Sequence, residues 1–306
     1  MSLVERALKK LQESRAAGNT EALRPAAPIA EPRPAARGES PVTRPLESVV
    51  REAPRREPPA RTVNVDKAAL RALDLLPPLD LERQIANQYQ QIKRPLVASV
   101  TSRPPAFPNP HLIMLASALP GEGKTFTSIN LALSMALEKD IEVLLIDADV
   151  AKPHVSDIFG LQHERGLLDL LVDRNLSVDS LILPTNVPGL SVLPAGKRLE
   201  NATELLASSR MREITAQLSA AHGRRIVLFD SPPLLLSTES RALVHVVGQV
   251  VLVVRAEFTA KNAVMEAIAA IGEEKPISLI LNQSSSLPSA GYYGYGSYGD
   301  PPPKPE

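Results

Sequence analysis

The sequence predicts an α/β fold in which a mostly parallel β-sheet is flanked by helices, and three observations support it. Short apolar runs recur from residue 111 onward, separated by segments long enough for a helix. Runs of this kind are typical of strands buried on both faces. A glycine-rich loop follows the first run, and acidic residues end two later runs. Because ligands bind at the carboxyl ends of parallel strands, these positions predict a binding site at one edge of the sheet.

The composition sets broad limits. The chain has 306 residues, 44% of them hydrophobic, which is enough for a sizeable core. Its 34 basic and 34 acidic residues cancel, so net charge gives no support for a nucleic-acid partner. Cysteine is absent, which excludes disulfides and thiolate metal sites and fits a reducing cytoplasm. No apolar stretch reaches the roughly 20 residues that cross a bilayer, and the N-terminus carries no secretory signal, so we expect a soluble protein.

Residues 1–20 predict a short amphipathic helix. Ser2 and Glu5 have the spacing of a capping box, and Gly18 is suited to end the helix. A helix this short is marginal alone, so its apolar stripe needs a partner, which is the rest of this chain, another protein or a membrane surface. The stripe consists of Leu3, Val4, Ala7, Leu8 and Leu11.

Residues 21–62 predict a disordered linker. Prolines alternate there with alanine, arginine and glutamate, a composition that favours a semi-extended chain without a core.

Residues 63–284 predict the folded domain. A helix is expected from Asp66 until the break at Pro77, and another over Leu81–Arg94, ending before Pro95. The six apolar runs that follow predict strands at His111–Ala118, Val143–Ile146, Leu190–Leu193, Ile226–Phe229, Gln249–Val254 and Ile277–Leu281.

The segment Ala118–Thr125 predicts a phosphate-binding loop. It ends in Gly-Lys-Thr between a predicted strand and a predicted helix, so its amides and the helix start can face phosphate oxygens. Lys124 is suited to reach the phosphates and Thr125 to bind Mg²⁺, although Ala118 stands where the usual pattern has glycine. The residues expected to bind the nucleotide here are Pro120, Gly121, Glu122, Gly123, Lys124, Thr125 and Phe126.

Three carboxylates follow predicted buried strands. Asp147 and Asp149 come after the second strand, and Asp230 ends the fourth. Buried carboxylates are costly unless a positive group lies near them, and Mg²⁺ with the loop lysine would supply it. The alternative for each is a helix cap. We favour a shared metal and phosphate site.

Residues 285–306 form a tail that is rich in tyrosine and glycine. Four of the chain's five tyrosines lie there. This composition cannot build a core, so the tail is either low-complexity sequence without a role or a substrate segment. The candidate phosphate acceptors are Tyr292, Tyr293, Tyr295 and Tyr298.

These motifs resemble those of a known family. LPGEGKT, VLLIDADVAKP and IVLFDSPP are similar to the Walker A, A′ and B motifs of the bacterial tyrosine kinases of exopolysaccharide and capsule export. The segment that begins Leu193-Pro194-Ala195-Gly196 also resembles this family. The opening MSLVERALKKL and Ile92-Lys93-Arg94-Pro95-Leu96 resemble its exosortase-associated (XrtA) autokinase branch.

The resemblance implies an enzyme that uses ATP and Mg²⁺ to phosphorylate its own tail, between neighbouring molecules. A phenol is a poor nucleophile at neutral pH, so a positioned carboxylate base is chemically sensible. The resemblance assigns the phosphates to Lys124, the metal to Thr125, Asp149 and Asp230, the base to Asp147 and the adenine contact to Asn282.

Two departures from the family pattern bear on partners. Related kinases carry Glu-x-x-Arg-x-x-Arg on a ring-forming helix, where this chain has Asn87, Gln90 and Lys93. The family is often fused to transmembrane helices, and the sequence predicts none here. We therefore expect the membrane partner, a polysaccharide chain-length determinant, to be a separate protein. The resemblance also implies self-association and a protein-tyrosine phosphatase as partners. The expected location is cytoplasmic, at the inner membrane through that partner.

Two other functions stay open at this stage. A partitioning or septum-positioning ATPase would share the fold, but those proteins carry a lysine early in the loop where this chain has Leu119, and they need no tyrosine tail. The second is a catalytically silent regulator that binds ATP, for which Ala118 and the altered ring motif leave room.

Overall fold

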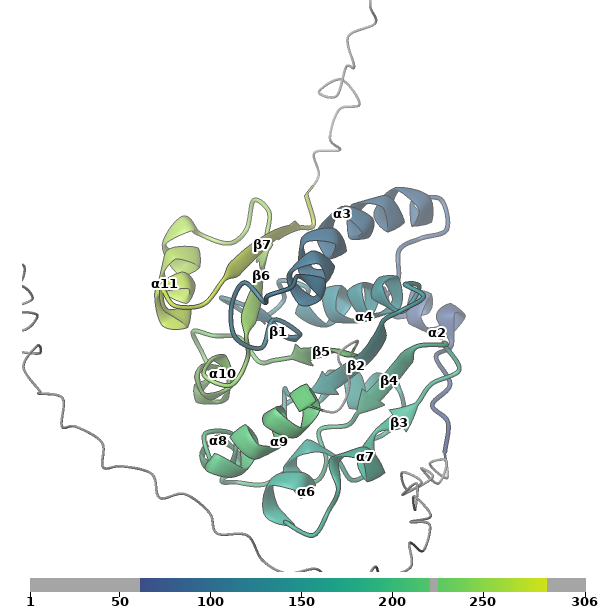
Figure 1. Cartoon of the computed structure of the whole chain (residues 1–306). Coiled ribbons are helices and arrows are strands. Elements are labelled where there is room, and N and C mark those ends of the chain that lie inside the picture. The colour runs from purple at the N-terminus through teal and green to yellow at the C-terminus, as the bar shows by residue number, and fades with distance from the viewer. Residues whose placement is uncertain (1–60, 221–224, 285–306) are drawn as a thin grey trace, which may run out of the picture. The chain divides into compact units, whose positions relative to one another are not determined.

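A seven-stranded sheet forms the centre of the computed structural model, which describes residues 61–220 and 225–284 (Figure 1). The strand order is β3-β4-β2-β5-β1-β6-β7, and all pairs are parallel except β3 with β4. The strands are β1 (Leu112–Ser117), β2 (Glu142–Asp147), β3 (Leu183–Pro184), β4 (Leu190–Leu193), β5 (Arg225–Asp230), β6 (Gln249–Arg255) and β7 (Ile277–Asn282).

The fold prediction is confirmed, since each of the six apolar runs forms a strand. In β1 and β5 every residue is buried, as continuous apolar runs require. Strand β3 was not predicted. It has two residues, pairs with β4 at the edge of the sheet and carries no run that could reveal it. The predicted N-terminal helix, the linker up to residue 60 and the tyrosine tail lie outside the described residues.

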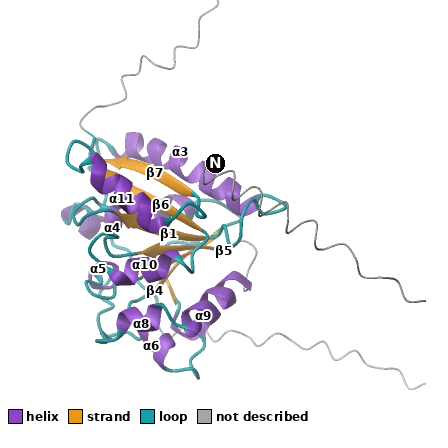
Figure 2. Ribbon diagram, turned by 90° about the vertical axis from the view of Figure 1, so that its left-hand side faces the viewer, coloured by secondary structure: helices purple, strands orange, loops and turns teal. Residues whose placement is uncertain are grey.

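Helices cover both faces of the sheet (Figure 2). The side chains of β1 alternate between two apolar clusters, with Leu112 and Met114 in one and Ile113 and Leu115 in the other. The second cluster contains residues of α2 (Lys67–Ala72), α3 (Glu82–Thr101), α4 (Lys124–Met135) and α5 (His154–Ile158). The first contains residues of α6 (Leu167–Val172), α7 (Val178–Leu181), α8 (Ala202–Leu206), α9 (Ser209–Ala220), α10 (Thr238–Val244) and α11 (Lys261–Ile271).

Helix α3 corrects one prediction, because it continues through Pro95 instead of ending before it. Proline removes one helical hydrogen bond, that to the carbonyl of Gln91. Gln91 and Pro95 are both exposed, so the unpaired carbonyl lies on the solvent side. On the other side Leu96 is buried against the sheet, and this packing outweighs the local preference to stop.

Lys93 of α3 is used within the protomer. Its side chain is 2% exposed, and its Nζ donates to the Ser134 carbonyl at 2.8 Å and pairs with Glu138 at 2.7 Å. Asn87 and Gln90, which share the position of the family's ring motif, are exposed and uncharged. Lys93, the only charged residue at these three positions, is therefore buried where α3 packs on α4.

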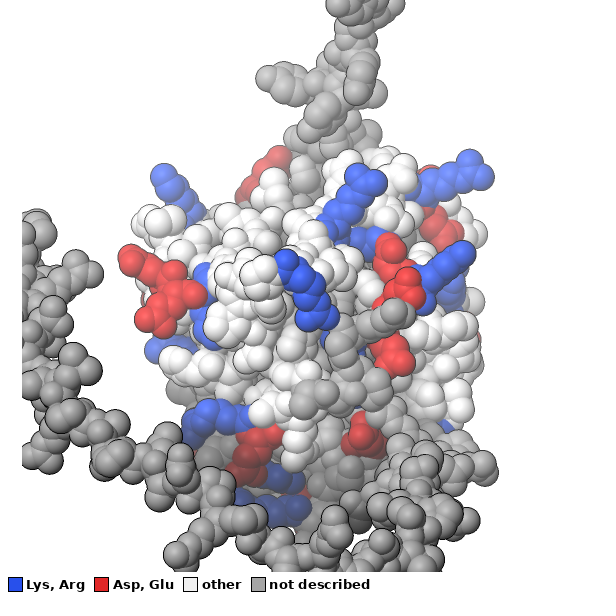
Figure 3. Space-filling model, in the orientation of Figure 1, with Lys and Arg blue, Asp and Glu red and all other residues white. Residues whose placement is uncertain are grey.

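One face of the molecule shows no single electrostatic character (Figure 3). On the face drawn in Figure 3, basic and acidic side chains are interspersed, in keeping with a formal net charge of zero. Within the described ranges, no helix combines the length and the apolar character that crossing a membrane requires.

Candidate active site

The loop between β1 and α4 has the backbone of a phosphate cradle. Gly121 and Gly123 adopt positive φ of 77° and 88°, values that a residue with a side chain rarely takes. At Gly123 a Cβ would also lie 2.1 Å from Nδ2 of Asn282. Helix α4 starts at the next residue, Lys124, so its free amides and its positive dipole end face the same place as the loop.

Asp230, the last residue of β5, is bonded to the first turn of α4. Its Oδ2 accepts a hydrogen bond from Thr125 Oγ1 at 2.9 Å, and its Oδ1 accepts one from Ser128 Oγ at 2.7 Å. Burial raises the pKa of this carboxyl, while the two hydroxyls and Lys124 oppose that change. The loop threonine and the end of β5 thus form one unit.

Asp147 ends β2 directly beside Asp230 in the parallel register. Its Oδ2 accepts from the backbone amide and the hydroxyl of Ser156, both at 2.7 Å. Its Oδ1 is buried without a hydrogen-bond partner. Burial, with the nearby charge of Asp230 adding to it, raises the pKa of Asp147 to about 8. This side chain is enclosed, with no exposed surface.

Asp149 lies two residues further on and reaches the open side of the site. Its Oδ1 accepts from the backbone amide of Lys152 at 3.0 Å. Burial raises the pKa of Asp149, and the hydrogen bond from the Lys152 amide and the charge of Lys124 act in the opposite direction. Of the three strand-end aspartates, Asp149 alone lines the cavity described next.

Lys124 is the cation among these carboxylates. It is 9% exposed, and burial lowers its pKa, while Asp230, Asp149 and Glu122 act in the opposite direction. Lys124 is the one buried lysine that lies among Asp230, Asp149 and Glu122 in the described site. A second cation bound there would stabilise the charged form of these carboxylates.

A cavity of about 780 Å³ opens above the loop, and its lining is both polar and apolar. Lys124, Thr125 and Asp149 are among the polar lining residues. The apolar part of the lining comes from Leu73, Leu75, Phe126, Ile158, Pro232, Pro233 and Leu236. The volume lies within the range of small-molecule sites, and the mixed lining suits a ligand with a charged and an apolar part.

The structure divides the predicted site residues into two groups. Pro120, Gly121, Gly123, Lys124, Thr125, Phe126 and Asp149 line the cavity. Four others do not line it, namely Glu122, Asp147, Asp230 and Asn282. Asn282 donates instead from Nδ2 to the Glu122 carbonyl at 2.9 Å. The four tail tyrosines lie outside the described residues.

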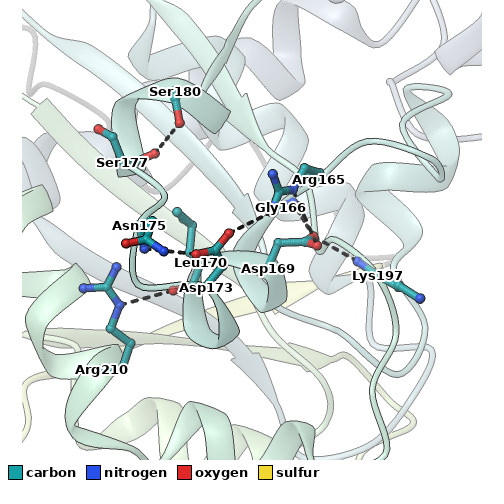
Figure 4. A network of polar contacts seen from close by, with 10 residues as sticks. All are labelled: Arg165, Gly166, Asp169, Leu170, Asp173, Asn175, Ser177, Ser180, Lys197 and Arg210. Atoms are coloured by element: carbon teal, nitrogen blue, oxygen red, sulfur yellow. Dashed lines mark hydrogen bonds and ion pairs between the residues drawn. The ribbon is translucent and has the colours of Figure 1, made fainter.

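A polar network holds the segment that follows β4 (Figure 4). Asp169 of α6 accepts from the amides of Gly166 at 2.9 Å and Lys197 at 3.2 Å. Gly166 has no room for a side chain, because a Cβ there would lie 2.0 Å from the Pro194 carbonyl oxygen. The network reaches the site through Ala195, whose amide donates to Ser156 Oγ at 3.0 Å, and Ser156 in turn holds Asp147.

These residues fit a nucleotide with a divalent cation. The glycine loop leaves space beside its amides, since a Cβ at Gly121 would meet nothing within 4 Å. The buried Oδ1 of Asp147, which has no hydrogen-bond partner, and the cluster of carboxylates around Lys124 can accept a positive charge. Within the described ranges no set of three or more His, Cys, Asp or Glu is arranged to hold a metal. A cation bound through one or two protein groups together with phosphates is the usual arrangement for Mg²⁺.

Comparison with known proteins identifies the family. Residues 111–280 match a family model described as an AAA domain. Tyrosine-protein kinase YwqD of Bacillus subtilis is 36% identical over 186 residues, which are 60% of this chain and 77% of that protein. The chain belongs to the bacterial tyrosine-protein kinase family. The putative tyrosine-protein kinase EpsB of Ralstonia nicotianae is 35% identical over 188 residues, but the chain spans only 24% of its length.

A solved structure of this family has the same fold. The VpsO kinase domain is 31% identical and superimposes with a TM-score of 0.55 over 67% of this chain and 98% of that domain. The predicted resemblance to the family is therefore confirmed. Its finer part, membership of the exosortase-associated branch, stays a prediction.

Some residues of the site were not predicted from the sequence. Ser128 follows Lys124 by one helical turn, so its position on the same face of α4 was a signal that could have been used. Ser156 and Thr259 belong to no motif. They reach Asp147 and Glu122 only through the fold.

Proposed function

We propose that this chain is a protein-tyrosine autokinase that uses ATP and Mg²⁺ to phosphorylate Tyr292, Tyr293, Tyr295 and Tyr298. The observation that carries the proposal is the arrangement of Lys124, Thr125 and Asp149 around one cavity, with Asp230 bonded to Thr125. Membership of a tyrosine-kinase family supports the reaction type. The tail supplies four phenols on the same chain.

The proposed roles follow from position and chemistry. The phosphates bind to the amides of the loop from Pro120 to Phe126 and to Lys124. Thr125, Asp149 and Asp230 hold Mg²⁺ directly or through water, and the metal neutralises phosphate charge. In the transfer, a tyrosine oxygen forms a bond to the γ-phosphorus, the bond to ADP breaks, and the phenol proton passes to a carboxylate. Asp147 is our candidate base, because its Oδ1 has no other hydrogen-bond partner.

Asp149 is the alternative base, because it lines the cavity whereas Asp147 is enclosed. Separate Asp147→Asn and Asp149→Asn variants distinguish the two. Loss of phosphoryl transfer with retained Mg²⁺-ATP binding identifies the base. Loss of Mg²⁺-ATP binding identifies a residue needed for the metal.

The proposed partner is a separate membrane-embedded chain-length determinant protein of polysaccharide export. The opening MSLVERALKKL, which resembles the exosortase-associated branch, offers an apolar stripe for docking. The chain would then work at the inner membrane through this partner. A protein-tyrosine phosphatase would return the tail to its unmodified state. Self-association would let one molecule present its tail to another.

Incubation of the purified chain with ATP and Mg²⁺, followed by mass spectrometry of the tail, tests the proposal. We expect phosphate on residues 292–298, and none when all four tail tyrosines are changed to phenylalanine. ATP hydrolysis without tail phosphate would replace the proposal with an ATPase switch. ATP binding with neither reaction would indicate a silent regulator.

A further inference from the structure

The side chain of Glu122 turns away from the cavity, although it lies within the phosphate loop. It has no exposed surface and does not line the cavity. Its Oε2 accepts a hydrogen bond from the Leu119 amide at 2.8 Å, within the same loop. Its Oε1 accepts a short hydrogen bond from the hydroxyl of Thr259. Glu122 therefore joins the loop to a part of the chain that lies 137 residues away.

The hydrogen bonds of Thr259 set the direction of its hydroxyl. Thr259 lies between β6 and α11, and its Oγ1 accepts from the backbone amide of Arg255 at 3.2 Å. With a lone pair of the oxygen engaged there, the hydroxyl proton is donated to the Glu122 carboxylate. Hydrogen bonds to a charged group are stronger than neutral ones. Thr259 is thus a fixed support for the loop.

Asn282 holds the backbone of the same residue from the end of the neighbouring strand, β7. It is the last residue of β7, and its Nδ2 donates to the Glu122 carbonyl at 2.9 Å. The amide group also packs against Gly123, where a Cβ would lie 2.1 Å from it. Thr259 follows β6 and Asn282 ends β7, so both supports of Glu122 lie on one side of β1, where the sheet order is β1-β6-β7.

We propose that Thr259 and Asn282 are positioning residues for nucleotide binding, which act by holding Glu122 so that the loop is ready for phosphate. The inference rests on one part of the proposed function, ATP binding at the loop, and does not depend on transfer to tyrosine. A loop that is already ordered loses less entropy when the phosphates bind. Removing either support should therefore weaken binding while the chemical step at saturating ATP changes little.

Thr259→Val tests the first support, with Thr259→Ser as the matched control. Valine keeps the shape but has no hydroxyl, whereas serine keeps the donor. The dissociation constants of Mg²⁺-ATP and of inorganic tripolyphosphate are measured by calorimetry, alongside the midpoint of thermal unfolding without ligand. We expect Thr259→Val to weaken both ligands about tenfold or more, the size of one hydrogen bond to a charged group, and Thr259→Ser about twofold.

Asn282→Ala tests the second support, because it removes the amide donor without adding a charge that would repel phosphate. Tripolyphosphate carries phosphates without a base. If Asn282 positions the loop, ATP and tripolyphosphate weaken by the same factor. If ATP alone weakens, Asn282 contacts the adenine and its part of the proposal is overturned.

Two outcomes would overturn the role of Thr259. One is binding of both ligands by Thr259→Val at wild-type affinity. The other is equal loss in Thr259→Val and Thr259→Ser, which indicates a steric effect. If Thr259→Val does not fold, Thr259→Ala, which creates no new contact, takes its place with the same expectations. A wild-type protein that binds ATP but leaves its tail unmodified would end the autokinase proposal and leave this one standing.

Discussion

The hydroxyl of Thr125 donates to Oδ2 of Asp230 at 2.9 Å, so the start of α4 and the end of β5 meet at one carboxylate. Ser128 occupies the other oxygen at 2.7 Å. Asp230 is 1% exposed, and burial raises its pKa. Burying a charged carboxylate lowers the free energy of unfolding, and a cation bound to it would offset that loss.

Asp230→Asn is therefore expected to separate stability from ligand binding. The amide keeps the shape and removes the buried charge, so the midpoint of thermal unfolding without ligand should stay equal or rise. The further stabilisation by Mg²⁺-ATP, about 2.7 kcal/mol for a ligand at a hundred times its dissociation constant, should be lost. Thermal unfolding with and without Mg²⁺-ATP measures both effects. Equal stabilisation of the wild type and the variant by Mg²⁺-ATP would contradict the assignment of Asp230.

Most of the secondary structure, but not all of it, could be predicted from local sequence patterns. The six longer strands were predictable, because each is a continuous apolar run, and in β1 and β5 every residue is buried. Strand β7, at the edge of the sheet, is instead half-buried or exposed along its length. Strand β3 was not predictable, because two residues leave no pattern. Helix α3 continues through Pro95 because Leu96 is buried against the sheet. This tertiary packing cannot be predicted from the residues around Pro95.

Within the site, the motif residues were predictable but their supports were not. Lys124 and Thr125 stand in a fixed spacing that their chemistry requires. Thr259 supports Glu122 across 137 residues, so only the fold brings them together. Asn282 was expected at the adenine, and its position against the Glu122 carbonyl depends on how β7 ends beside the loop.

Lys124→Met should abolish labelling of the tail and leave the fold intact. Methionine fills much of the same space without a charge, and burial already lowers the pKa of this lysine, so folding loses little. The phosphates lose their only buried cation within the described part of the loop. Mass spectrometry of the tail and circular dichroism of the same sample measure both effects. Persistent labelling of a folded variant would remove Lys124 from the mechanism.

Tyr89 should remain unphosphorylated when the tail is labelled. It is 7% exposed, burial raises its pKa, and its hydroxyl is hydrogen-bonded to Thr127. Tyr89→Phe should leave labelling unchanged and lower the free energy of unfolding by about 1 kcal/mol, the loss of one buried hydrogen bond. Peptide mapping and urea unfolding measure the two effects. Phosphate on Tyr89 in folded protein would show that this part of the core opens.

Lys93→Ala should destabilise the protein, and Arg94→Ala should not. Lys93 is 2% exposed and pairs with Glu138 at 2.7 Å, whereas Arg94, the next residue of α3, is exposed. Truncating Lys93 removes buried packing and a hydrogen bond to the Ser134 carbonyl, for a loss of about 1–3 kcal/mol, against less than about 0.5 kcal/mol for Arg94. Urea unfolding compares them. Similar losses in both variants would show that Lys93 has no special role in packing α3 on α4.

His111 should make the stability of the protein fall as the solution is acidified. Burial lowers the pKa of this imidazole, and its Nε2 is enclosed without a hydrogen-bond partner. Just below about pH 6.5 the imidazole is protonated in the unfolded chain but stays neutral in the folded chain. Protons then bind preferentially to the unfolded state, so the free energy of unfolding falls as the pH falls. The decline continues until the pH reaches the lowered pKa of the folded state. His111→Gln, which cannot titrate, should show a shallower fall between about pH 7.5 and 5.5 in urea unfolding, because the other groups are unchanged and cancel in the comparison. Parallel curves for the wild type and the variant would mean that His111 is protonated equally in both states.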